Sequence, residues 1–154
     1  MTTMIGAKLT EAYTNLTDGA SFGLGDRYVD KNGNEYVFVQ ASGSVAQYDA
    51  VHINSANIAQ AMTQALGATG LPAGIAVATL SSASYGWAQI KGLGTVNVLQ
   101  TCSSSTALYT SGTAGKLDDT TTSQVKIAGV VILANQTQSA AAAAVIGTYP
   151  YAAI

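Results

Sequence analysis

The stretch Gly74–Leu99, G-I-A-V-A-T-L-S-S-A-S-Y-G-W-A-Q-I-K-G-L-G-T-V-N-V-L, decides the fold class of this chain. It contains three apolar or alternating runs, at 74–80, 85–91 and 95–99, and small or turn-forming residues separate them. Such runs are typical of consecutive antiparallel strands. We therefore expect two hairpins here, with the G-L-G segment Gly92–Gly94 as the turn of the second.

The middle run of this stretch carries Trp87, the only tryptophan of the chain, on the same parity as Tyr85. Successive side chains of a strand point to opposite faces, so these two rings share one face of the expected sheet. They are interpreted either as the packing centre of the domain or as a contact between subunits, and the first interpretation is favoured.

Further strands are expected on both sides of this stretch. The clearest signal is the hairpin 26–40, in which D-R-Y-V-D and E-Y-V-F-V-Q flank K-N-G-N, because Asn-Gly accepts the positive φ of a tight turn. Single strands are predicted at 48–53, 107–110 and 126–133, the last apolar enough to be buried on both faces. For 140–149 a strand is preferred to an alanine helix. The fold class is therefore mainly β, an antiparallel β-barrel or β-sandwich.

One short helix is expected within 54–66. Ser55 would cap it, one apolar stripe would run from Ile58 to Leu66, and Gly67 would end it. A long polar loop is the alternative for this segment.

The N-terminal residues are predicted to form an extended arm, 1–22, ahead of a single β domain, 23–154. Four apolar side chains recur in the arm at roughly helical spacing: Ile5, Leu9, Tyr13 and Leu16. Short segments with weak periodicity are marginal by themselves. The arm is interpreted either as a segment that becomes ordered against a partner or as a frayed terminus.

Charged residues make up only 9% of the chain, far below the ~25% of ordinary globular proteins. The polar surface must therefore consist of hydroxyl and amide side chains, which cost less to desolvate than ions and so suit permanent protein contacts. A soluble β domain with neutral faces is the alternative. The net charge is −2 and the six basic residues are spread singly, which argues against nucleic acid as a partner.

Targeting signals are not expected either. The first twelve residues contain no apolar core of signal-peptide length, and the late apolar run 140–146 is too short to cross a bilayer. We therefore expect no membrane partner. The single cysteine fits synthesis in a reducing compartment.

The residue types that could carry chemistry do not form a catalytic pattern. His52 lies three positions after Asp49 in an expected strand, so the two side chains would point to opposite faces. Cys102 has no partner for a disulfide or a thiolate metal site, although a symmetric oligomer could bring copies of His52 together. Asp118 and Asp119 are interpreted as turn residues, with a cation site as the alternative. We expect no enzyme activity, no cofactor, no catalytic residue and no metal.

Five segments together resemble a known family: G-D-R-Y-V-D-K-N-G-N-E-Y-V-F-V-Q-A (25–41), G-I-A-V-A (74–78), Y-G-W-A-Q-I-K-G (85–92), A-L-Y-T-S-G-T-A-G-K-L-D-D (107–119) and K-I-A-G-V-V (126–131). Their order is similar to that of the small head-decoration, or capsid cement, proteins of tailed bacteriophages. The patterns Y-G-W-x-Q-x-x-G and L-Y-x-x-x-T-A-G-x-L-D-D are the most specific parts of this resemblance.

The resemblance implies a compact β module that binds the outside of an assembled capsid, with the major capsid protein as partner and a homo-oligomer, a trimer by preference. It also implies a location on the capsid exterior of the virion, after synthesis in the cytoplasm of the host bacterium. The expected contacts with the capsid or between subunits are Ile5, Leu9, Tyr13, Leu16, Tyr85 and Trp87. The alternative function is a head-fibre or tail module that binds a host-surface glycan or protein through exposed Tyr and Trp side chains.

Overall fold

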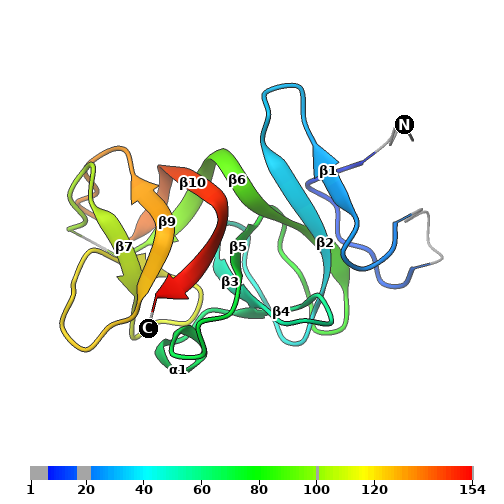
Figure 1. The fold of residues 1–154 in the computed structure, drawn as a ribbon, viewed down its shortest axis with the longest axis horizontal. Helices are drawn as coiled ribbons and strands as arrows, with labels where there is room; N and C mark the ends of the chain where they lie inside the picture. Colours follow the sequence, from blue (N-terminus) through cyan, green and yellow to red (C-terminus); the bar gives the residue numbers. More distant parts are fainter. Residues whose placement is uncertain (1–6, 17–21, 100, 154) are drawn as a thin grey trace.

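The computed structural model of the protein describes residues 7–16, 22–99 and 101–153 (Figure 1). It confirms the predicted fold class, since 46% of the chain is strand, 3% is helix and no helix has 7 or more residues. Among the described residues, no helix is long and apolar enough to span a bilayer.

The elements follow one another along the chain as ten strands and one helical turn within the described residues. Their bounds are β1 Arg27–Val29, β2 Glu35–Ala41, β3 Ala50–Ile53, β4 Ile58–Ala61, α1 Gln64–Gly67, β5 Ala73–Ala76, β6 Tyr85–Val98, β7 Ala107–Thr110, β8 Leu117–Asp118, β9 Lys126–Ile132 and β10 Ala140–Ala153. The two longest strands, β6 and β10, have 14 residues each and pair with one another.

Five strands close into a β-barrel in the order β2, β4, β3, β5, β6 and back to β2. The pairing of β2 with β4 is parallel and the others are antiparallel. Buried aliphatic side chains from these strands fill the barrel, among them Val37, Val39, Val51, Ile53 and Ile90. We call this the first barrel.

The remaining strands form a second ring of pairings that also includes β6, in the order β6, β10, β9, β7, β8. A parallel contact between Val98 of β6 and Leu117 of β8 closes it. Its core also contains Ala50 of β3, with Ala73 and Ile75 of β5. The second ring therefore packs directly against the first barrel, and Figure 1 shows the two side by side, with β6 running between them.

Strand β6 continues straight through Gly92–Gly94, so the predicted hairpin turn there is wrong. The strand pairs with β2 as far as Lys91 and with β10 from Gly92 onward. Gly92 has φ of +106°, a conformation that side-chain-bearing residues rarely adopt. The glycine allows the strand to change partners without ending.

The predicted helix at 54–66 is also wrong over most of its length. Ile58–Ala61 is strand β4, which fills the place between β2 and β3 and so closes the first barrel. The Asn54 side chain supports the turn into it, since its Oδ1 accepts from the N–H groups of Ala56 at 2.9 Å and Ile58 at 3.0 Å. The helix is only α1, and its cap is Thr63, not Ser55. Tertiary pairing outweighs helical spacing here.

The prediction that 126–133 is buried on both faces is wrong as well, because β9 buries one face in the second ring and leaves the other face partly exposed. Ile127, Val130 and Ile132 are buried, whereas Lys126 and Gly129 are exposed. The other strand predictions are confirmed: the hairpin of β1 and β2, with Gly33 at φ of +81°, and the strands β3, β7 and β10.

Candidate functional site

Four of the predicted contact residues meet in one aromatic cluster on the outer side of the first barrel. Tyr13 and Trp87 are buried in it, and Leu9 and Tyr85 pack against it. The cluster also contains Phe22, Tyr36 and Phe38. Of the other two predicted contacts, Leu16 is 40% exposed, and Ile5 lies outside the described residues.

Trp87 is the centre of this aromatic cluster and has no exposed surface. Its ring meets those of Phe22 and Phe38 edge-on, with centroids 5.0 and 5.1 Å away, and that of Tyr28 at 6.1 Å. Such tilted and T-shaped pairs are the favoured geometry of aromatic rings. The burial favours packing over contact for Trp87, and the contact role given to Tyr85 and Trp87 stays a prediction. Its indole Nε1 is buried without a hydrogen-bond partner in the described structure.

The described part of the predicted arm lies on the domain. The backbone N–H of Tyr13 donates to the carbonyl of Tyr85, and the N–H of Tyr85 donates back to the carbonyl of Tyr13, both at 2.8 Å. The Tyr13 ring lies 6.1 Å from that of Phe38. Residues 7–16 thus cover one side of the aromatic cluster, while the division of the chain at residue 22 and the contact role of the arm stay predictions.

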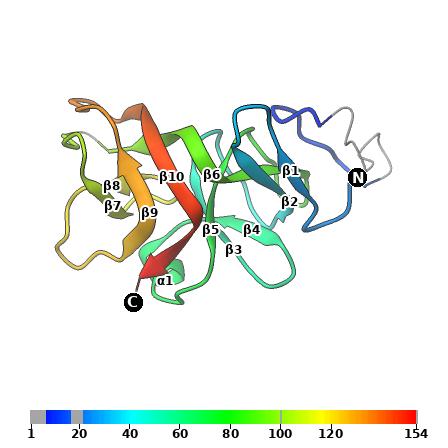
Figure 2. The same ribbon diagram turned by 45° about the horizontal axis from the view of Figure 1, so that its top comes forward.

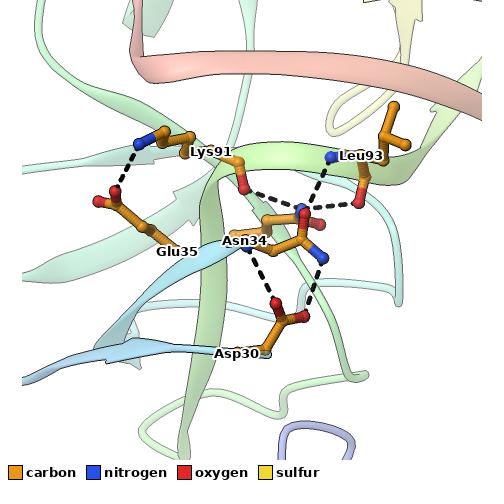
Figure 3. A network of polar contacts seen from close by, with 6 residues as sticks. Asp30, Asn34, Glu35, Lys91 and Leu93 are labelled. Atoms are coloured by element: carbon orange, nitrogen blue, oxygen red, sulfur yellow. Dashed lines mark hydrogen bonds and ion pairs between the residues drawn. The ribbon is translucent and has the colours of Figure 1, made fainter. Parts of the chain in front are cut away.

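A polar network links the β1–β2 turn to β6 (Figure 3). Asn34 donates to the Asp30 carboxylate through its backbone N–H at 3.0 Å and its Nδ2 at 2.8 Å. Its Oδ1 accepts from the backbone N–H of Leu93 at 3.0 Å. Burial acts to raise the pKa of Asp30, but the hydrogen bonds from Asn34, Asn32 and Tyr36 together outweigh it and hold that pKa below its ordinary value. The charged carboxylate therefore anchors the turn that supports β6.

Gln89 supports the same part of β6 from within the strand. Its Nε2 donates to the carbonyls of Lys91 at 3.1 Å and Leu93 at 3.0 Å, on either side of Gly92. Lys91 in turn forms an ion pair with Glu35 at 2.8 Å (Figure 3). Sequence reasoning missed Gln89, although its place in the Y-G-W-x-Q-x-x-G pattern was a signal that it had a specific role.

His52 and Asp49 do not bond to each other in the structure, as their spacing predicted. The Asp49 carboxylate accepts from the N–H of Ala46 at 3.0 Å and from Nδ2 of Asn97 at 2.8 Å. His52 is buried, its Nε2 has no hydrogen-bond partner in the described structure, and burial lowers its pKa. The imidazole is therefore neutral at pH 7.

Cys102, Asp118 and Asp119 come together, with one potential ligand atom of each lying within 4.8 Å of the others. The Cys102 thiol contacts Asp118 Oδ1 at 3.5 Å, and Asp119 Oδ2 accepts from the N–H of Ser103 at 2.8 Å. Asp118 Oδ1 also accepts from the N–H of Asp119, as in the predicted turn role. Burial raises the pKa of Cys102 to about 11, so a cation here would have to displace the thiol proton.

The buried Cys102 thiol should react slowly in the native protein. Because burial raises its pKa from 9.0 to about 11, the thiolate fraction at pH 8 should be about 100-fold lower than in the unfolded chain. Alkylation by a maleimide at pH 8, followed by mass spectrometry with and without urea, measures this. The control is Ser103→Cys in a Cys102→Ala background, since position 103 is exposed and should react fast in both states. Equal native rates for the two proteins would contradict the prediction.

Sequence reasoning also missed a set of apolar side chains on the outside of the second ring. We call it the outer apolar face and define it as Leu93, Val131, Leu133, Ala143 and Val145. Strands β9 and β10 are apolar at almost every position, so their sequences do not show which parity points outward. Ala142, Ala144 and Ile146 are buried because they point into the closed second ring, whereas residues 141, 143 and 145 point outward and are exposed.

No protein-family model matches the chain, and no curated protein sequence matches it.

Proposed function

We propose that this protein is a structural virion protein that binds the outer surface of an assembled phage capsid and cements it. The proposal includes the major capsid protein as partner, a homo-oligomer with trimers preferred, and a position on the exterior of the virion. It starts from the resemblance to head-decoration proteins over 85–92 and 108–119.

The observation that carries this proposal is the structural role of the residues in those two patterns. From the first, Trp87 centres the aromatic cluster, Gln89 braces the strand and Gly92 allows β6 to change partners. Gln89 and Gly92, two residues of this pattern, therefore lie at the junction between the first barrel and the second ring.

The second pattern joins the two rings from the other side. Gly115, at φ of +79°, donates its N–H to the carbonyl of Met62 at 2.8 Å and accepts from the N–H of Ala50 at 2.7 Å. Leu117 is fully buried and pairs with Val98 of β6. These contacts fix the second ring relative to the first barrel. A protein that cements a capsid must present its contact surfaces in one fixed geometry, so the contacts support the proposed role.

The weakly charged exterior supports the same role. With 9% charged residues, a permanent contact with a capsid would strip water from few ions. The alternative function is a head-fibre or tail module that binds a host-surface glycan or protein through exposed Tyr and Trp side chains. Trp87 has none of its surface exposed, so this observation favours the cementing role.

The test uses heads of the encoding phage assembled without this protein. The purified full chain should sediment with the heads to a saturating, simple ratio to the major capsid protein, and should raise the temperature at which the heads open. Electron microscopy of heads with and without the protein should show added density at equivalent surface sites. Protein that stays in the supernatant at every concentration would refute the proposal.

A further inference from the structure

The outer apolar face spans β6, β10 and β9, with Leu133 directly after β9, and Figures 1 and 2 show these three strands side by side. Val145 of β10 lies opposite Leu93 of β6 on one side and Val131 of β9 on the other. The N–H of Leu133 donates to the carbonyl of Ala143 at 2.9 Å, which places these two residues side by side as well. Leu93, Val145 and Val131 therefore form one row. Ala143 and Leu133 lie in the next row, where the β6 partner of Ala143 is Thr95.

The large side chains of this face are well exposed: Leu93 by 65%, Leu133 by 45% and Val145 by 39%. The other exposed large hydrophobic residues of the described chain are Leu16, Val29 and Leu71, which belong to three separate segments. Single exposed apolar residues are ordinary, whereas a contiguous group marks an interaction surface.

The outer apolar face carries no charge. On the elements that form it, Lys91 is ion-paired with Glu35 and Lys126 stands at the first position of β9. A partner that placed an ion over the face would lose the hydration of that ion with no opposite charge to replace it. The matching surface must therefore itself be apolar or neutral.

The area of the face limits which partner could bind it stably through this face alone. Strands lie about 4.8 Å apart and rise about 3.4 Å per residue, so three strands and a few residues along each give on the order of 200 Å² per copy. A stable pair in solution buries about 800 Å² per partner. The face is too small to sustain a dimer alone, but a weak contact made with the shell by every member of one homo-oligomer gains by avidity, because the copies are linked.

We infer that the outer apolar face is the surface by which the protein seats on the capsid, against an uncharged apolar patch of the assembled shell. This inference rests on the proposed function and adds the contact residues to it. It places the contact on the second ring, away from the aromatic cluster at the first barrel, where Trp87 is fully buried.

The test compares two matched double variants of the full chain in the head-binding assay. Leu93→Thr with Val145→Thr alters the face, and Val29→Thr with Leu71→Thr changes one leucine and one valine of similar exposure elsewhere, at 58% and 39%. Threonine keeps the β preference of the three strand positions, 29, 93 and 145, while adding a hydroxyl. We expect the face variant to bind heads at least about tenfold more weakly, equivalent to about 1.4 kcal/mol, and the control to bind like the parent chain. Thermal melting of both variants should stay close to that of the parent.

The outcomes separate the two proposals. A parent chain that binds no heads overturns the proposed function and this inference with it. A parent that binds, together with a face variant that binds equally well, overturns the inference and leaves the proposed function standing. If sedimentation velocity without heads shows that the face variant alone loses self-association, a second copy of the chain covers the face, and the inference is again overturned.

Discussion

Trp87→Ala should lower the free energy of unfolding by about 3–5 kcal/mol, the usual result of emptying a core aromatic site. The side chain has no exposed surface and contacts the rings of Phe22, Phe38 and Tyr28. These neighbours come from separate segments, so they cannot close the cavity by one shared movement. Urea unfolding followed by far-ultraviolet circular dichroism measures the change, since the variant lacks the tryptophan signal.

Trp87→Phe is the matched control for this substitution. It keeps most of the apolar contact and removes the indole N–H, which is buried without a hydrogen-bond partner in the described structure. We expect it to cost less than about 2 kcal/mol. If Trp87→Ala proved as stable as Trp87→Phe, Trp87 would not be the packing centre of the aromatic cluster.

Gly92→Ala should be the most damaging glycine substitution in β6, at about 3 kcal/mol or more. The residue has φ of +106°, and a Cβ placed on it would lie 2.0 Å from Oδ1 and 3.0 Å from Cα of Asn34. The left-handed conformation costs an L-residue roughly 1–2 kcal/mol, and loss of the bond between Asn34 and the N–H of Leu93 adds to it. Chemical denaturation measures the total.

Gly33→Ala separates the cost of the left-handed backbone from the cost of losing the Asn34 contact. Gly33 has φ of +81°, but nothing lies within 4 Å of its Cβ position. This variant should therefore show the backbone cost alone, about 1–2 kcal/mol. Equal losses for the two variants would show that the Asn34 contact contributes nothing to the stability of the strand change at Gly92.

Local patterns predict those parts of the fold that local chemistry decides. The β1–β2 hairpin follows from Asn32-Gly33, because that pair accepts the positive φ of the turn, and the structure has it there. The identification of Trp87 as a packing centre also follows, since a lone large aromatic residue within strands needs cover. The hairpin needs only neighbouring residues, and the packing of Trp87 follows from its residue type, although its partners come from distant segments.

The wrong predictions concern what distant strands decide. Gly92–Gly94 has the composition of a turn, yet β10 arrives from 140–153 to pair with the second half of β6, so the strand continues. Ile58–Ala61 has helical spacing, yet the first barrel needs a strand between β2 and β3. The outer apolar face was missed for the same reason, because closure of the second ring chooses which parity of β10 is exposed.

The shared strand β6 also sets the order in which the two rings can fold during synthesis. The five strands of the first barrel lie within residues 35–98, so a growing chain contains that barrel in full before β7 to β10 exist. The strands after β6 contain only four of the five members of the second ring. No single cut of the polypeptide yields two complete rings. The first barrel can therefore close during synthesis. Its last strand, β6, is then already in place when β10 and β8 of the second ring pair with it.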